Sequence, residues 1–463
     1  MSPPLRNVSV MLRRSIALAL LGVIASTACA SAPQKGQRVR IVHTNDLHGH
    51  VERAAAVAAV AAQQRREEPN TLFLDGGDCI SGTPLSTIFQ GRPIFEIMSA
   101  MGYDAAAVGN HEYDHGWELI EEFRELATFP LLCANARDPE GKLLADKEYT
   151  VFEKGGVRIG VIGLITASVP SLTQKKCSEG CSFEDPIVAA RRLVPQVRKL
   201  ADVIVLLTHC GVQTDAAIAG AVEGIDLIVG GHSHTELKAA LNVNGTRIVQ
   251  AKSYFERVGI IDFVWDPETR KITDFTSRLV TIDADTMAND PVVKELVDTW
   301  EEKVDAQVAE VIGASSGLGK KQLRTRIEQI YKELLDCDFG YQNMGGIRAI
   351  IASGDIRIRD VWTVLPFDNT LVKLTLPGNK LYAYARKQLG DRFDPNAEYT
   401  IATNSYVSDQ QEKYFKVTDA KVEDTGLLMR DEVVKWVRKH AGFKPKTGAT
   451  TSPEGGAVPN EKR

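Results

Sequence analysis

Five short clusters of histidine, aspartate and asparagine recur between apolar runs of the 463-residue chain. In chain order they are Asn45-Asp-Leu-His-Gly49, Gly77-Asp78, Gly109-Asn-His-Glu112, Thr208-His209 and Gly230-Gly-His-Ser-His234. Imidazole and carboxylate side chains of this kind bind divalent cations such as Mn, Zn, Co or Fe. Each cluster alone is a weak signal, because short motifs often occur by chance. Together and in this order they predict a metal centre.

Two divalent cations about 3.5–4 Å apart need a bridging carboxylate to reduce their repulsion. Asp78 is the natural candidate for this bridge. In extended backbone, residues two apart point to the same side, which predicts that Asp46 converges with His48, and His232 with His234. Four histidines lie outside the clusters, and a structural or surface role is preferred for each. They are His43, His50, His115 and His440.

The elements that must position these clusters follow from the hydrophobic pattern. Short apolar runs alternate with helical patterns from Arg38 to about Asp283, and each cluster directly follows such a run. This alternation predicts an α/β sandwich with helices outside the sheets. Ligand sites in such folds lie at the carboxyl ends of the strands. The pattern therefore predicts that the clusters meet at one edge.

The second half begins with a new helix. Asp290 is a good N-cap and Pro291 fits the first helical position, and apolar residues then recur at helical spacing until Gly313. We interpret 290–313 as a connecting helix and 314–440 as a second domain. The tail 442–463 is rich in Pro, Gly, Thr and Glu and is predicted to be disordered.

The N-terminus has the pattern of a signal peptide over residues 1–30. Arginines precede the apolar stretch 16–24, which is too short to span a bilayer. Ala28-Cys29-Ala30 offers a cleavage site, whereas Thr27-Ala28-Cys29 resembles the end of a lipobox. Plain secretion to the periplasm or outside the cell and a lipid anchor on Cys29 both stay open. An anchor of this kind is the one membrane contact that the sequence suggests.

The net charge of the chain limits the classes of partner that are expected. A net charge of −5 and a pI near 6.1 give no general attraction to a polyanion, so a nucleic-acid polymer is not an expected partner.

A disulfide between Cys177 and Cys181 is favoured over two surface thiols, because export would bring the pair into an oxidising compartment. A packing role is expected for the cysteines within or beside apolar runs, Cys79, Cys133, Cys210 and Cys337.

The five clusters, taken together, resemble the motifs of calcineurin-like metallophosphoesterases. The longer strings 43–49, 81–86 and 109–114 narrow the resemblance to the 5′-nucleotidase family, over nearly all of 38–283. The strings 343–348 and 365–369 are similar to the C-terminal domain of that family. The resemblance implies a four-layer α/β/β/α sandwich followed by a smaller α/β domain. It also implies an enzyme that releases phosphate from nucleoside 5′-monophosphates.

Matching positions imply a role for each site residue. The resemblance implies one metal ion held by Asp46, His48, Asp78 and His234, and a second held by Asp78, Asn110, His209 and His232. It implies that His111 is the catalytic histidine beside the phosphate, that Asp114 orients it, and that Asn110 belongs to the same catalytic group. A helix N-cap is the alternative role for Asp114.

The resemblance further implies a substrate-binding group in the second domain, formed by Asn343, Gly346 and Arg348. A guanidinium supplies forked donors for phosphate. The alternative for Arg348 is a surface arginine, and Arg357 and Arg359 are weaker candidates.

The second domain departs from the family pattern where the nucleobase is bound. The segment that carries the first of two base-stacking rings is expected to be absent near 388–401, and 404–415 replaces a glycine-rich loop. Tyr406, Tyr414 or Phe415 are the candidate replacements, although core packing is favoured for each and also for Phe367. Hydrolysis is therefore better supported than nucleotide specificity. Broader phosphodiester or nucleotide-sugar hydrolysis stays open, as does a non-catalytic surface binding protein.

Overall fold

The computed structural model describes residues 36–381, 389–390 and 393–443. The expected signal peptide with Cys29, the tail from 444 onward and part of the segment near 388–392 lie outside these residues. Across the part of the chain that is described, every helix is too short or too polar to cross a membrane.

The first six-stranded sheet carries the N-terminal clusters. Its central strands β1 (Gln37–Thr44), β2 (Thr71–Asp75), β3 (Ala105–Ala107) and β4 (Leu131–Leu132) run parallel. The long hairpin of β13 (Arg257–Asp266) and β14 (Lys271–Thr281) continues the sheet antiparallel to β1, in the order β14-β13-β1-β2-β3-β4.

The second six-stranded sheet carries the later clusters, in the order β11-β12-β10-β9-β7-β6. Strands β7 (Val157–Ile165), β9 (Val203–His209), β10 (Leu227–Gly230) and β12 (Thr246–Val249) are parallel. Two antiparallel strands close its edges, β6 (Tyr149–Lys154) and β11 (Leu241–Val243). A small separate pair is formed by β5 (Ala136–Arg137) and β8 (Ser182–Phe183).

The two sheets pack face to face because their strands are apolar on both sides. Ile41, Leu72 and Leu74 join Val205 and others from the second sheet in one buried cluster. The alternate residues Val42 and Phe73 belong instead to a cluster with helices. This alternation is the two-residue period of a strand.

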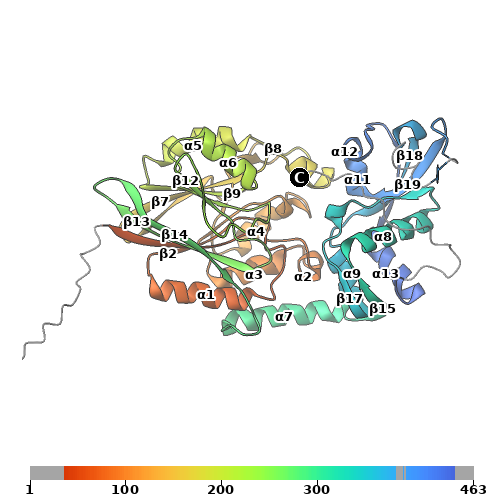
Figure 1. Ribbon diagram of the computed structural model, residues 1–463, viewed down its shortest axis with the longest axis horizontal. Coiled ribbons are helices and arrows are strands. Elements are labelled where there is room, and N and C mark those ends of the chain that lie inside the picture. The colour runs from red at the N-terminus through yellow and green to blue at the C-terminus, as the bar shows by residue number, and fades with distance from the viewer. Residues whose placement is uncertain (1–35, 382–388, 391–392, 444–463) are drawn as a thin grey trace, which may run out of the picture. The chain divides into compact units, whose positions relative to one another are not determined.

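Helices cover the outer face of each sheet (Figure 1). The first sheet is covered by α1 (Ala54–Glu67), α3 (Arg92–Met101) and α4 (Leu119–Leu126), with the short α2 (Pro84–Ile88) beside them. The second is covered by α5 (Pro186–Val197) and α6 (Val212–Ala221). The predicted four-layer α/β/β/α sandwich is confirmed.

The helix after the sandwich is shorter than the sequence predicts. Helix α7 spans Pro291–Val308, and the Asp290 side chain accepts hydrogen bonds from the backbone N–H groups of Val292 and Val293. It was expected to reach Gly313, but β15 (Val311–Leu318) begins first because it pairs antiparallel with β17 (Ile351–Arg357). Strand pairing thus overrides the helical spacing at Val311.

A smaller α/β region follows, as predicted. Its four-stranded sheet has the order β16-β19-β18-β20. These strands are β16 (Phe339–Gly340), β18 (Thr370–Pro377), β19 (Glu398–Asn404) and β20 (Lys421–Leu428). The helices α8 (Lys320–Leu335), α9 (Ile358–Val364) and α13 (Met429–His440) pack in one core with the β15–β17 pair, and Phe443 also packs there. The short helices α11 (Ser405–Asp409) and α12 (Gln411–Phe415) follow β19.

Candidate active site

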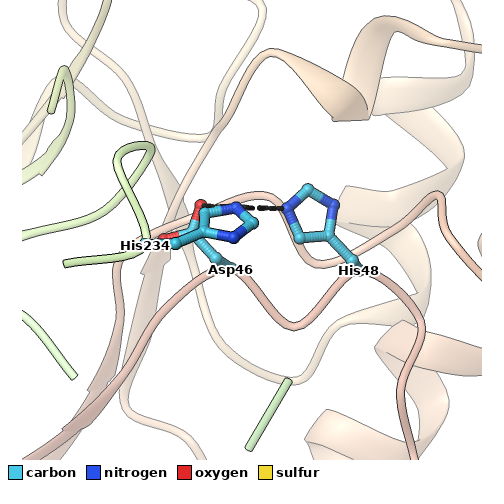
Figure 2. A group of neighbouring side chains, drawn as sticks. All are labelled: Asp46, His48 and His234. Atoms are coloured by element: carbon cyan, nitrogen blue, oxygen red, sulfur yellow. Dashed lines mark hydrogen bonds and ion pairs between the residues drawn. The ribbon is translucent and has the colours of Figure 1, made fainter. Parts of the chain in front are cut away.

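The strand ends bring the first ligand group together. Asp46 and His48 follow β1, and His234 follows β10. The Nε2 atoms of His48 and His234 lie 3.0 Å apart, and Asp46 Oδ1 lies 3.3 Å from His234 Nε2 (Figure 2). All three side chains can offer one ligand atom to a shared cation.

A second group adjoins the first through Asp78. Asp78, His209 and His232 place their ligand atoms within 4.8 Å of one another. Asp78 Oδ2 lies 2.9 Å from His209 Nε2 and 3.8 Å from His48 Nε2. One carboxylate therefore stands between both groups, which is where a bridge between two cations would stand.

The ligand-bearing backbone is left-handed rather than extended. Positive φ angles occur at Asp46 (54°), His48 (50°), Asp78 (57°), His232 (76°) and His234 (51°). The extended backbone expected from the sequence is therefore wrong, although the side chains do converge. Residues other than glycine avoid this region, and such strain is concentrated at functional sites. Tight turns at the strand ends, and not the two-residue period, aim these side chains.

Backbone carbonyls fix which imidazole nitrogen faces the centre. His48 Nδ1 lies 3.1 Å from the Ser81 carbonyl, and His209 Nδ1 lies 2.8 Å from the Gly76 carbonyl. Because a carbonyl oxygen only accepts, each Nδ1 must carry the proton and donate. Each Nε2 is then left with a lone pair for a cation, as in many metal-binding histidines.

Two buried polar atoms among the described residues support a cation in this place. Asn110 Oδ1 is buried without a hydrogen-bond partner there, and the buried His209 Nε2 faces the Asp78 carboxylate at 2.9 Å. An unpaired buried polar atom is costly, so it calls for a partner. Burial opposes a charge on His209, but Asp78 and Asp46 outweigh it and raise its pKa to about 10. The carboxylates therefore create a negative site that favours positive charge, and the donor set fits divalent metal ions.

Two further residues support the centre, and neither has a role predicted from the sequence. Glu112 is 1% exposed and accepts hydrogen bonds from the N–H groups of Asp78 (3.1 Å), Cys79 (2.7 Å) and Gly109 (2.6 Å). The side-chain amide of Asn45 donates to Asp46 Oδ2 at 2.6 Å. Their positions within two of the clusters were the only sequence signal.

His111 and Asp114 form a pair beside the centre. The short helix His111–Tyr113 turns His111 Nδ1 to 2.6 Å from Asp114 Oδ2. Burial opposes protonation of His111, but Asp114 and Asp78 outweigh it and raise its pKa above the ordinary value. Asp114 is not the cap of the following helix, because α4 begins at Leu119 with Glu118 at its N-cap.

A cavity of about 330 Å³ opens onto the centre and receives side chains from both halves of the chain. From Gln37 onward the described residues form one compact unit, so these side chains share one site. From the sandwich the cavity is lined by Asp78, Asn110, His111, Asp114, His232 and His234. From the second half it is lined by Asn343, Gly346, Arg348, Phe367, Tyr406, Lys413 and Tyr414. Its size is that of a small-molecule site.

Arg348 faces the centre. Burial lowers the pKa of His48, and the charge of Arg348 lowers it further. Arg348 therefore lies at the cavity beside the centre, and its role in substrate binding stays a prediction. Arg357 instead donates to the Ala309 carbonyl, and Arg359 pairs with Glu301 and Asp305.

Phe367 corrects the expectation of a core residue. Its ring lies 5.7 Å from that of His111 at an interplanar angle of 11°, and the Arg348 guanidinium lies 5.8 Å from its centroid. Tyr406 and Tyr414 also line the cavity, whereas Phe415 is buried as expected. A ring is thus present in the cavity on a loop that precedes the departing segments.

Two more expectations concern His115 and the pair Cys177 and Cys181. His115 lines the cavity, and its Nδ1 lies 3.3 Å from Asp368 Oδ2. Cys177 and Cys181 are both free, because Cys177 is buried and its thiol donates to the Asp114 carbonyl. The other described cysteines are buried, as expected.

Two protein-family models match the two halves of this chain. The family model for calcineurin-like phosphoesterases matches residues 39–236, and the model for the C-terminal domain of 5′-nucleotidases matches 304–388. Protein UshA of Yersinia enterocolitica is 27% identical, over 89% of this chain and 93% of that protein. The 5′-nucleotidase of Vibrio cholerae is 29% identical, over 78% and 79%.

Among solved structures, the 5′-nucleotidase precursor from Thermus thermophilus has the same fold, with a TM-score of 0.77 and 24% identity over 88% of this chain and 97% of that one. The fold and the cluster of histidines and aspartates define a metal-dependent phosphoester hydrolase. Within that class, the chain belongs to the 5′-nucleotidase family.

Proposed function

We propose that this chain is an exported two-metal 5′-nucleotidase that releases phosphate from nucleoside 5′-monophosphates. The observation that carries the proposal is one cavity lined by Asp78, His232 and His234 from the ligand groups and by Arg348 and Phe367 from the second half. These residues match the parts of such a substrate, since the metal groups and the arginine suit phosphate and the ring suits a nucleobase. The names of the relatives support the same substrate class.

The two cations share Asp78 in this proposal and otherwise have different ligands. Asp46, His48, Asp78 and His234 hold one, and Asp78, Asn110, His209 and His232 hold the other. When bound, the cations supply Lewis acidity for the phosphoryl oxygens and lower the pKa of an attacking water. Nitrogen-rich ligand sets suit Mn, Zn, Co or Fe.

The protein groups around the cavity bind and orient the substrate. The raised pKa of His111 favours its protonated form, which can donate from Nε2 to a phosphoryl or leaving-group oxygen. Asp114 fixes that orientation by accepting from Nδ1 at 2.6 Å. Arg348 donates to the phosphate, with Asn343 and Gly346 beside it, while Phe367 provides an apolar face for the base.

Export and the division of labour between the two halves belong to the same proposal. We assign catalysis to 38–283 and substrate binding to 314–440, joined through 290–313. The arginine-rich, apolar N-terminus supports export, with or without a lipid on Cys29. Cell fractionation and mass spectrometry of the mature N-terminus test both points. A cytoplasmic protein that keeps its first 30 residues would contradict export.

The activity is tested with the purified chain and a substrate panel. Metal content is measured by elemental analysis, and phosphate release is measured for nucleoside 5′-monophosphates, 2′,3′-cyclic nucleotides, nucleotide sugars and glycerol phosphate. We expect two metal ions per chain and the highest kcat/KM for the 5′-monophosphates. Faster hydrolysis of a cyclic nucleotide or nucleotide sugar would contradict the proposed substrate. Metal binding without any hydrolysis would favour a binding protein.

A further inference from the structure

Tyr254 lies against the first ligand group. Its ring centroid is 5.7 Å from that of His48 and 5.6 Å from that of His234, with interplanar angles of 69° and 82°. A third contact joins it to His50, at 4.3 Å. Aromatic rings at such distances and near-perpendicular angles attract each other through the positive edge of one and the negative face of the other. One side chain therefore contacts two metal-group imidazoles at once.

The loop that carries this ring is strained. Lys252, Tyr254 and Phe255 have φ angles of 63°, 59° and 53°, although none is glycine. Backbone of this kind persists only where the surrounding structure holds it, and it is concentrated at functional sites. The concentration of three such residues in four positions points to a requirement for this particular loop shape.

Hydrogen bonds tie the loop to the segments that bear the ligands. The Tyr254 N–H donates to the Asp46 carbonyl at 2.9 Å, and the Lys252 N–H donates to the Thr235 carbonyl at 3.1 Å. The Ala251 N–H donates to Asn45 Oδ1 at 2.7 Å. Phe255 is 1% exposed and anchors the loop in the helix-side core of the first sheet. These contacts leave Tyr254 directed at the metal group.

The position of the ring separates its role from substrate binding. His234 lines the substrate cavity, but Tyr254 is not part of the cavity wall. Its contacts with the site are made through His48 and His234 instead. On the outer side it packs on His50, whose Nδ1 lies 3.3 Å from Glu52 Oε1.

We propose that Tyr254 is a positioning residue that fixes the ring planes of His48 and His234 and thereby sets the metal affinity of the first ligand group. The proposal rests on the two-metal function proposed above. Residues that orient metal ligands typically change metal affinity by about 10–100-fold when they are removed. The effect should be confined to the group that the ring contacts, because the Gly76 carbonyl holds His209 and the His111 N–H holds Asp78.

In the test, the metal-free full chain is titrated with Mn²⁺ and, separately, with Zn²⁺, and calorimetry measures the binding. In Tyr254→Ala we expect one of two sites to weaken by about 10–100-fold, while the other changes by less than about threefold. Tyr254→Phe keeps the ring and should bind both ions as the wild type does. Tyr149→Ala removes a partly buried aromatic that packs on the far side of the second sheet, and serves as the control. If Tyr254→Ala does not fold, Tyr254→Leu replaces it, because it fills much of the space without an aromatic ring.

Kinetics provide a second readout. With excess metal, Tyr254→Ala should recover turnover with an unchanged KM for adenosine 5′-monophosphate, because the ring does not line the cavity. Equal weakening of both sites, no weakening of either, or a Tyr254→Phe variant as weak as Tyr254→Ala would overturn the proposal. A wild-type chain that binds fewer than two ions would overturn the two-metal function as well, whereas two tight ions in every variant would overturn only the role of Tyr254.

Discussion

At the scale of single residues, Asp78 joins the two ligand groups. Its Oδ2 lies 2.9 Å from His209 Nε2 and 3.8 Å from His48 Nε2. We expect Asp78→Asn to lower the bound metal below two ions per chain and turnover by more than about 100-fold, since a neutral amide cannot offset two cations. Elemental analysis and initial rates on the purified variant measure both. Two ions and an unchanged rate would show that another group bridges the metals.

His111 should behave differently, because it lies beside the ligands and pairs with Asp114 at 2.6 Å. In His111→Ala we expect both metal ions to remain while kcat falls by roughly 10²–10⁴-fold, the usual contribution of a positioned acid or base. Asp114→Asn should reduce kcat less, since the imidazole remains. Loss of metal from His111→Ala would instead place this histidine among the ligands.

The ligand residues were predictable because their side chains carry the chemistry. Asp46, His48 and Asp78 are recognisable from residue type and from their position after an apolar run. Their partners were not predictable in the same way. The carbonyls of Gly76 and Ser81 orient two imidazoles, but a backbone carbonyl has no residue signature. The left-handed φ angles at these aspartates and histidines also have no signature in the sequence.

At the scale of elements, the strand-to-loop turns hold the centre, and Gly109 shows how closely they pack. A Cβ atom at this position would overlap the backbone nitrogen and side chain of Asp78, with Cγ at only 2.9 Å. We expect Gly109→Ala to displace Asp78 and to reduce metal content and kcat by at least about tenfold, since Asp78 is the proposed bridge. Metal analysis and steady-state kinetics measure this effect.

Gly220 provides the matched control. It lies in α6, where a Cβ atom would meet nothing within 4 Å. Gly220→Ala should therefore leave metal content and kcat unchanged, and it should raise the free energy of unfolding by roughly 0.5–1 kcal/mol through the better helix propensity of alanine. Equal metal content in both variants would mean that Asp78 tolerates displacement.

Element types followed from local patterns, whereas their ends and neighbours depended on distant residues. The sandwich was predictable from alternating apolar runs and helical spacing. The end of α7 at Val308 was not, because Val311 pairs with Arg357, which is far along the chain. Tyr254 reaches the centre for a similar reason, since β13 returns antiparallel beside β1 and brings its preceding loop back to Asp46.

At the scale of the whole molecule, the substrate cavity combines the metal groups of the sandwich with side chains of the second half. The loop 365–369 is joined to the sandwich at several points. Thr87 Oγ1 donates to the Pro366 carbonyl at 3.0 Å, and Gln174 Nε2 donates to the Asp368 carbonyl at 3.2 Å. His115 and the buried Arg430 both pair with Asp368. Phe367, between these anchors, is therefore held over His111 instead of packing in a core.

This arrangement predicts modest base selectivity. The cations and Arg348 bind phosphate, which every ester substrate shares, while aromatic stacking on Phe367 distinguishes bases only weakly. We expect kcat/KM for adenosine and uridine 5′-monophosphates to lie within about one to two powers of ten of each other. A preference of roughly a thousandfold would require hydrogen bonds to one base, beyond what stacking supplies.

Phe367→Ala tests the ring directly. Stacking contributes about 1–3 kcal/mol per base, so KM for nucleoside monophosphates should rise by roughly 5–150-fold. Glycerol phosphate has no base and serves as the internal control, because its kcat/KM should change by less than about threefold if the ring contacts only the base. Metal content should stay at the wild-type value, since Phe367 contacts His111 and Arg348 and no proposed ligand. An equal loss for both substrates would mean that Phe367 instead positions His111 for the reaction that all esters undergo.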